Sequence, residues 1–246
     1  MYIINMNPLT IVVIVIIIVL VYFLLRYMFS DPYTLQNIQN GKTTATIEAS
    51  SLATTGSAAD NTNFAYSIWF YINDWNYRYG DVKTIYTRTD SSNTHPCPAV
   101  QLDAIENNLT VTLACFPGTA TVAGQPATVV DHTCTVGNIP IQRWVNLIVS
   151  VYGRSMDVYI DGKLVKTCLL PGVANIKSAN NIYVTPGGGF DGWTSKFQYF
   201  PSPLNPQEAW NIYVAGYSSP YANMFSSYQV QISLLENGNA QSTLTI

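Results

Sequence analysis

The sequence predicts an all-β fold, an antiparallel β-sandwich, preceded by one N-terminal transmembrane helix. Short strand-like runs alternate with turn signals from Phe64 onward, at the spacing expected of a sandwich. No segment among these runs keeps a helical period for more than three turns. Only 10% of the residues are charged, and Arg26 is the one charged residue among the first 30, so the N-terminal segment differs sharply from the rest.

The apolar segment Leu9–Phe29 has the length of a membrane span. As a helix its 21 residues would extend roughly 31 Å, which matches the hydrocarbon core of a bilayer. We therefore expect a transmembrane anchor at residues 1–29, with Tyr22, Arg26 and Tyr27 at the membrane interface. A cleaved signal peptide is disfavoured because residues 1–7 contain no Lys or Arg. By the positive-inside rule, Arg26 places the C-terminal domain on the cytosolic side.

The remainder of the chain divides into three parts. Residues 30–63 read as a polar stalk with one expected strand at Thr43–Ala49. Residues 64–216 form the sandwich, and residues 217–246 form a C-terminal extension with an added strand at Tyr228–Leu235. The strands expected in the sandwich are Phe64–Ile72, Val82–Thr87, Ala99–Leu102, Leu109–Cys115, Trp144–Tyr152, Met156–Ile160, Lys163–Cys168, Ile182–Thr185 and Trp193–Phe200.

Two local signals fix particular connections. Asp161-Gly162 separates two alternating runs, and an Asp-Gly pair in that position favours a type I′ hairpin. The segment Asn205–Trp210 has Asn at the N-cap, Pro at the first helical position and Glu at the third. This capping-box arrangement predicts one short helix at the periphery of the sandwich.

Several motifs follow one another in a characteristic order. The long strand Phe64–Ile72 is followed by paired strands that meet at a Tyr-x-Asp-Gly hairpin, Tyr159–Gly162. A Gly-Phe-Asp-Gly-Trp sequence at Gly189–Trp193 and the turn Leu204–Glu208 come later. In order and spacing, residues 43–215 resemble the laminin-G-like domains of the concanavalin A-like lectin and glucanase superfamily. The resemblance implies a concanavalin A-like jelly roll, and its motifs serve the fold rather than a ligand.

The resemblance implies two classes of function. Similar anchored domains occur among virion proteins of large DNA viruses, so we expect a non-catalytic minor capsid protein or membrane-to-shell tether. Such a protein would be single-pass in the virion's internal membrane, with its domain facing the protein shell, and its partners would be the lipid bilayer and capsid proteins. The alternative is a membrane-anchored carbohydrate- or receptor-binding lectin-like module. The sequon Asn108–Thr110 discriminates between them, because it would carry sugar only in a secretory lumen.

Catalysis and nucleic-acid binding are not expected. Glucanases of this superfamily use a strand resembling Glu-x-Asp-x-x-Glu, and none of the four glutamates stands in that pattern. A net charge of −3 without a run of Lys or Arg disfavours nucleic acid as a partner. The glycines 187–189 precede a strand rather than a helix, which disfavours a phosphate loop.

No cofactor is expected, although some relatives bind calcium through loop acids, for which Asp74, Asp81 and Asp90 are the candidates. The four cysteines contain no Cys-x-x-Cys pair, which disfavours zinc. Cys115 and Cys134 flank a Gly/Pro/Thr-rich insertion and could form a disulfide across its base. Four cysteines allow three connectivities, and the sequence does not choose among them.

Two segments are candidates for an interaction surface. A loop after the first long strand concentrates aromatic residues and an Arg, which protein interfaces and sugar-binding faces use. Packing of this loop on the edge of the sandwich is the alternative. The strand of the C-terminal extension alternates cleanly and would offer an edge to a neighbouring molecule. The candidate residues are Trp75, Tyr77, Arg78, Tyr79, Tyr228, Val230 and Ile232.

Overall fold

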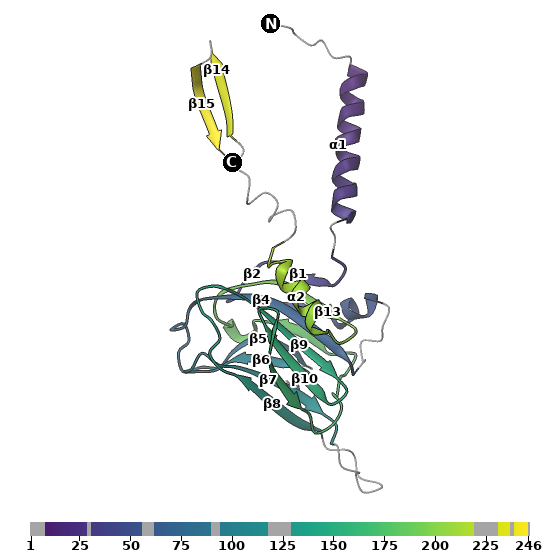
Figure 1. Ribbon diagram of the computed structural model, residues 1–246, viewed down its shortest axis with the longest axis vertical. Helices are drawn as coiled ribbons and strands as arrows, with labels where there is room; N and C mark the ends of the chain where they lie inside the picture. Colours follow the sequence, from purple (N-terminus) through teal and green to yellow (C-terminus); the bar gives the residue numbers. More distant parts are fainter. Residues whose placement is uncertain are drawn as a thin grey trace. The chain divides into compact units, whose positions relative to one another are not determined.

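The computed structural model describes residues 8–28, 31–55, 62–89, 94–117, 129–218, 231–236 and 239–245 (Figure 1). By its internal contacts the chain divides into two units, Met1–Pro32 and Tyr33–Ile246. The first unit contains the helix α1, and the second contains the sandwich.

Helix α1 spans Pro8–Met28, which agrees with the helix expected at Leu9–Phe29. The large apolar side chains from Val12 to Leu24 are all exposed, at 40–62%. Within the described part of the chain, no helix combines the length and the apolar character needed to cross a membrane. The transmembrane anchor is therefore not supported, and the interfacial roles expected for Tyr22, Arg26 and Tyr27 stay predictions.

The second unit is an antiparallel sandwich of two sheets, as the sequence predicted. The order in the first sheet is β1 (Thr34–Gln36), β13 (Asp191–Phe200), β4 (Phe64–Asp74), β9 (Trp144–Tyr152), β10 (Ser155–Ile160) and β11 (Lys163–Leu169), and β2 (Gln39–Asn40) also pairs with β13. The order in the second sheet is β3 (Ala45–Ile47), β12 (Asn181–Val184), β5 (Lys83–Thr89), β6 (Ala99–Leu102), β7 (Leu109–Cys115) and β8 (Val130–Val136). Short 3-10 helices lie at Ala49–Thr55 and Pro186–Gly188.

The core lies between the two sheets and follows from strand alternation. In β4 the even-numbered side chains from Phe64 to Ile72 belong to the core cluster. Successive strand residues point to opposite faces, so Trp69 and Tyr71 lie on the outer face of the first sheet. Full burial of a Phe or Ile side chain contributes roughly 1.5–3 kcal/mol to the free energy of folding. The alternation in β4 therefore decides which of its aromatic residues stabilise the core and which face outward.

Both local connections are confirmed. Asp161 and Gly162 have φ of 51° and 71°, which is the pair of positive values that a type I′ turn requires. Helix α2 spans Pro206–Val214 and begins with a complete capping box. The backbone N–H of Glu208 donates to Asn205 Oδ1 at 2.9 Å, and the Asn205 N–H donates to Glu208 Oε2 at 2.8 Å.

The proposed pairing of Cys115 with Cys134 is wrong, because Cys134 forms a disulfide with Cys168 and Cys115 is a buried free thiol. The register explains the difference: Cys115 lies opposite Val130, whereas Cys134 lies opposite Val111. Cys134 and Cys168 stand on β8 and β11, the last strands of the two sheets, with their Cα atoms 6.2 Å apart. The disulfide thus joins the two sheets at one edge of the sandwich.

The strand expected at Tyr228–Leu235 differs in its extent and its partner. Strand β14 spans Gln231–Glu236 and pairs with β15, Asn239–Thr245, as a separate two-stranded sheet. Ile232 lies opposite Leu244 in this hairpin, and Tyr228 and Val230 lie outside the described residues. Pairing within the chain satisfies one edge of β14, which was expected to be free for a neighbouring molecule.

Candidate functional site

A row of aromatic side chains crosses the outer face of the first sheet. Trp193 of β13 lies opposite Tyr71 of β4, and Tyr71 lies opposite Trp144 of β9. The ring centroids of each neighbouring pair are 5.8 Å apart. Tyr217, which follows α2, stacks on Trp144 with centroids 4.4 Å apart and an interplanar angle of 10°. We call Tyr71, Trp144, Trp193 and Tyr217 the aromatic face.

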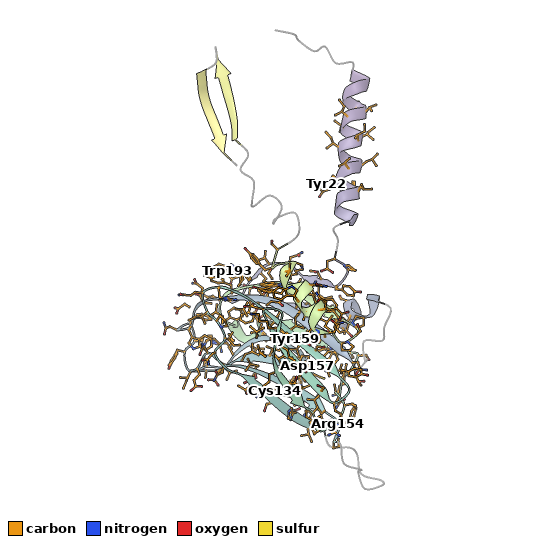
Figure 2. All side chains as sticks on the ribbon, viewed as in Figure 1. Tyr22, Cys134, Arg154, Asp157, Tyr159 and Trp193 are labelled. Atoms are coloured by element: carbon orange, nitrogen blue, oxygen red, sulfur yellow. A yellow bond between two sulfur atoms is a disulfide. The ribbon has the colours of Figure 1, made fainter. Side chains whose placement is uncertain are left out.

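The aromatic face is accessible at two of its members. Trp193 is 41% exposed and Tyr217 is 38% exposed. Figure 2 labels Trp193 at the surface of the sandwich. Aromatic rings held in this way offer a large apolar contact area that is already fixed in position. The face therefore has the character of a preorganised binding surface rather than of core packing.

Three polar side chains cluster where β4 ends and β13 begins, two residues along each strand from Tyr71 and Trp193. Asn73 lies two residues after Tyr71, where the register between β4 and β13 shifts, and its side chain is exposed. Its amide Nδ2 donates to Asp191 Oδ2 at 2.8 Å, and Lys42 Nζ lies 2.5 Å from Asp191 Oδ1. Lys42, Asn73 and Asp191, which we call the polar group, combine hydrogen-bond donors and acceptors at one place.

The polar group is electrostatically coupled. The hydrogen bond from Lys42, followed by that from Asn73, lowers the pKa of the Asp191 carboxyl below its ordinary value of 3.8. The same hydrogen bond from Lys42 to Asp191 raises the pKa of the Lys42 ammonium above 10.5. Both residues therefore stay charged at neutral pH and hold each other in place.

A tight backbone approach occurs between the polar group and the aromatic face along β13. Gly192 separates Asp191 from Trp193, and its φ is +154°. A Cβ atom at this position would lie 1.8 Å from the carbonyl oxygen of Tyr71. Only glycine fits there, so the spacing between Asp191 and Trp193 depends on this residue.

The loop Trp75–Tyr79, predicted as an interaction surface, is largely used to hold the structure together. Trp75 Nε1 donates to the Ile105 carbonyl at 3.0 Å, and Tyr77 Oη donates to the Gly188 carbonyl at 3.1 Å. Arg78 donates to the Gly187 carbonyl at 2.6 Å. Tyr79 is 59% exposed. The loop still borders the site, because Lys42 Nζ lies 4.6 Å from the centroid of the Tyr77 ring.

The calcium candidates do not converge in the described residues. Asp74 Oδ1 accepts hydrogen bonds from Asn76, and Asp81 pairs with Arg78 at 3.4 Å. Asp90 lies outside the described residues. Among the residues described, no three His, Cys, Asp or Glu side chains come together as metal ligands.

The aromatic face and the polar group were missed by sequence reasoning. Alternation along Phe64–Ile72 already places Trp69 and Tyr71 on one side of that strand. Trp144 and Trp193 were recognised only as parts of strands. The register that aligns them with Tyr71 joins residues far apart in the sequence, and no local signal reports it.

Several solved structures share this two-sheet β-sandwich fold. No known family profile matches the chain, and no curated protein matches it. Among solved structures, the receptor binding domain of botulinum neurotoxin C/D mosaic serotype matches with a TM-score of 0.52 and 14% identity, over 73% of this chain and 42% of that chain. The binding domain of botulinum neurotoxin serotype G matches with a TM-score of 0.50 and 17% identity, over 73% and 46%.

A third similar structure belongs to botulinum neurotoxin type C, whose cell entry is described as dependent upon interaction with two ganglioside molecules. It matches with a TM-score of 0.50 and 17% identity, over 70% of this chain and 40% of that chain. The chain thus spans less than half the length of these structures. At such identities the similarity establishes the fold alone, and two of these three structures are described as binding domains. Neither a laminin-G-like family nor a capsid protein is specifically supported.

Proposed function

We propose that the sandwich is a non-catalytic binding module for carbohydrate, and that sugar binds on the aromatic face beside the polar group. The juxtaposition of Trp193 and Tyr71 with Asn73 and Asp191 carries the proposal. Sugar rings present an apolar C–H face and a rim of hydroxyls. Aromatic rings complement the first, and carboxylate and amide groups complement the second.

Similar structures and the disulfide support the same proposal. One similar structure is a receptor binding domain, and another belongs to a botulinum neurotoxin whose cell entry is described as dependent upon gangliosides, which carry sugar. Disulfides such as Cys134–Cys168 form and persist mainly in oxidising compartments, where a surface lectin works. This favours placement of the sandwich outside the cytosol, opposite to the side expected from Arg26.

A glycan array with the full chain, followed by titration of the best glycan, tests the proposal. Trp193→Ala removes an exposed ring, and Asn73→Ala removes an amide from the polar group. Loss of an aromatic anchor at a binding site costs about 2 kcal/mol or more, so we expect Trp193→Ala to weaken affinity by about thirtyfold.

Tyr152→Ala is the matched control. Tyr152 is 68% exposed and is the last residue of β9, whereas Trp144 is the first. Removal of its ring should therefore leave glycan affinity unchanged. Thermal unfolding of each variant verifies the fold. Absence of specific glycan binding, or binding that survives both Trp193→Ala and Asn73→Ala, would reject the proposal.

A second proposal retains the structural role in an assembly. The exposed apolar side chains of α1 are its supporting observation, because a continuous apolar surface needs an apolar partner. On this proposal the sandwich binds capsid-type proteins and the chain belongs to a virion membrane. Crosslinking in the native source separates the two: a stable structural protein as the main product, without glycan binding, favours the assembly role.

A further inference from the structure

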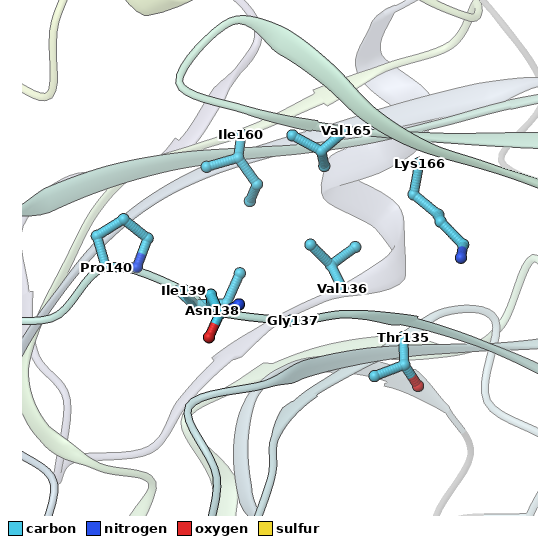
Figure 3. Close-up of a pocket in the computed structure, with 9 residues that line it drawn as sticks. All are labelled: Thr135, Val136, Gly137, Asn138, Ile139, Pro140, Ile160, Val165 and Lys166. Carbon is cyan, nitrogen blue, oxygen red and sulfur yellow. The ribbon is translucent and has the colours of Figure 1, made fainter.

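A pocket opens between the two sheets at the edge that carries the disulfide. Its volume is about 430 Å³, within the range of sites that hold small ligands. We call it the edge pocket (Figure 3). The residues that line it are Thr135, Val136, Gly137, Asn138, Ile139, Pro140, Ile160, Val165 and Lys166.

The walls of the edge pocket come from different sheets. Thr135 and Val136 end β8, and Val165 and Lys166 belong to β11, each the last strand of its sheet. Cys134 and Cys168 join these strands next to the lining residues. The disulfide therefore fixes the separation of the two walls, and the pocket is preorganised while the disulfide is intact.

The lining has a simple chemical character. Five of its side chains are apolar, and Figure 3 shows Ile160 and Val165 across the opening from Val136 and Pro140. Lys166 is the single charged residue of the lining. Its side chain is exposed, and its ammonium group forms no ion pair with any residue that the structure describes. A ligand with an apolar body and one negative charge would satisfy both features.

A peptide strand fits this edge poorly. The register of β11 against β10 shifts between Val158 and Tyr159, which leaves Val165 as an extra residue in a bulge. Lys163 and Lys166 flank the bulge on the exposed strand. Bulges and lysines are devices that block pairing at sheet edges. The bulge instead directs Val165 into the lining of the pocket.

We propose that the edge pocket binds a small anionic amphiphile, a carboxylate on a compact apolar body, with the charge at Lys166 and the body between Val136, Ile160 and Val165. The site is separate from the aromatic face and does not depend on the carbohydrate proposal. Affinity for a small aliphatic acid should be in the millimolar range, given the number of atoms that it can bury.

Lysine acetylation footprinting of the full chain tests this proposal with octanoate as the probe. Tandem mass spectrometry reports the acetylation rate of Lys166 and of Lys163, which stands on the same strand outside the lining. At ten times its Kd, octanoate should slow acetylation of Lys166 about tenfold and leave Lys163 unchanged. Octanol, which has the same apolar chain without the charge, and glucuronate, which has the charge without an apolar body, should protect neither lysine.

Two variants provide the matched control. Val165→Glu places a negative charge in the lining and should abolish protection of Lys166. Leu164→Glu, at a neighbouring position of similar exposure outside the lining, should retain it. The proposal would be overturned if octanoate slowed acetylation of Lys163 and Lys166 equally, or slowed neither up to its solubility limit. Protection of Lys166 by glucuronate but not by octanoate would also overturn it. Trp193→Ala should not affect this footprint, so failure here is distinguishable from failure of the carbohydrate proposal.

Discussion

Replacement of Gly162 by Ala should destabilise the sandwich more than replacement of Gly153. Both glycines have positive φ, +71° and +56°. An L-residue in this region costs about 1–2 kcal/mol of backbone strain, so each substitution should lose that much. At Gly153 nothing lies within 4 Å of the new Cβ atom, and strain is the whole cost.

At Gly162 the new Cβ atom also meets helix α2. It would lie 3.0 Å from Tyr213 Cβ and 3.1 Å from Trp210 Cα. Contacts this close force the helix or the hairpin to move, and overpacking of this kind costs about 1–3 kcal/mol. The expected total is therefore about 2–5 kcal/mol for Gly162→Ala, against about 1–2 kcal/mol for Gly153→Ala.

Urea unfolding followed by tryptophan fluorescence measures both losses. The urea concentration at the unfolding midpoint should fall for both variants, and it should fall further for Gly162→Ala. The dependence of the unfolding free energy on urea concentration should not change. Equal losses at the two sites would show that α2 does not pack against the hairpin as described. No loss at Gly153 would refute the strain argument itself.

Three further predictions test the disulfide, the polar group and the helix cap. Replacing Cys134 and Cys168 by Ser opens a loop of sequence separation 34 and should cost about 3–4 kcal/mol in urea unfolding; an unchanged midpoint would argue against the bond. Folding lowers the pKa of Asp191, so its ion pair with Lys42 contributes its full stability above pH 3.8, and this stability is lost as the pH falls through the pKa of the folded state. The Asp191 carboxyl should therefore titrate below pH 3.8 by NMR, and Lys42→Gln should raise its titration midpoint. Asn205→Ala removes the N-cap of α2 and should cost about 1 kcal/mol, whereas Gln207→Ala on the exposed first turn should cost less than half of that by the same assay.

Local features of this fold could be predicted from the sequence because their causes are local. The hairpin at Asp161-Gly162 and the cap at Asn205 each depend on the conformational preferences of neighbouring residues. Most strands of the sandwich begin and end within two residues of their expected positions. Strand β8 was missed because its residues, exposed at Val130 and several later positions, do not form an apolar run.

The site and the disulfide could not be predicted because they depend on register and on which strands end each sheet. Cys134 and Cys168 become neighbours only because β8 and β11 are both terminal strands of their sheets. Trp193, Tyr71 and Trp144 align only through two ladders between distant segments. In both cases the decisive quantity is a pairing of remote residues, which the spacing along the chain does not encode.

The turn at Asp161-Gly162 and the cap at Asn205 nevertheless affect the position of the aromatic face. The I′ turn leaves space at Gly162 for α2 to pack, and the capping box fixes where α2 begins. Tyr217 follows the end of that helix and stacks on the ring of Trp144. Ser195 Oγ donates a hydrogen bond of 2.6 Å to the Tyr217 carbonyl oxygen. Rigidly held rings anchor a ligand at lower entropic cost, so on the carbohydrate proposal affinity at the aromatic face depends on a turn and a cap that lie outside that face. Gly162→Ala should therefore weaken glycan binding as well as lower stability, although it replaces no residue of the aromatic face.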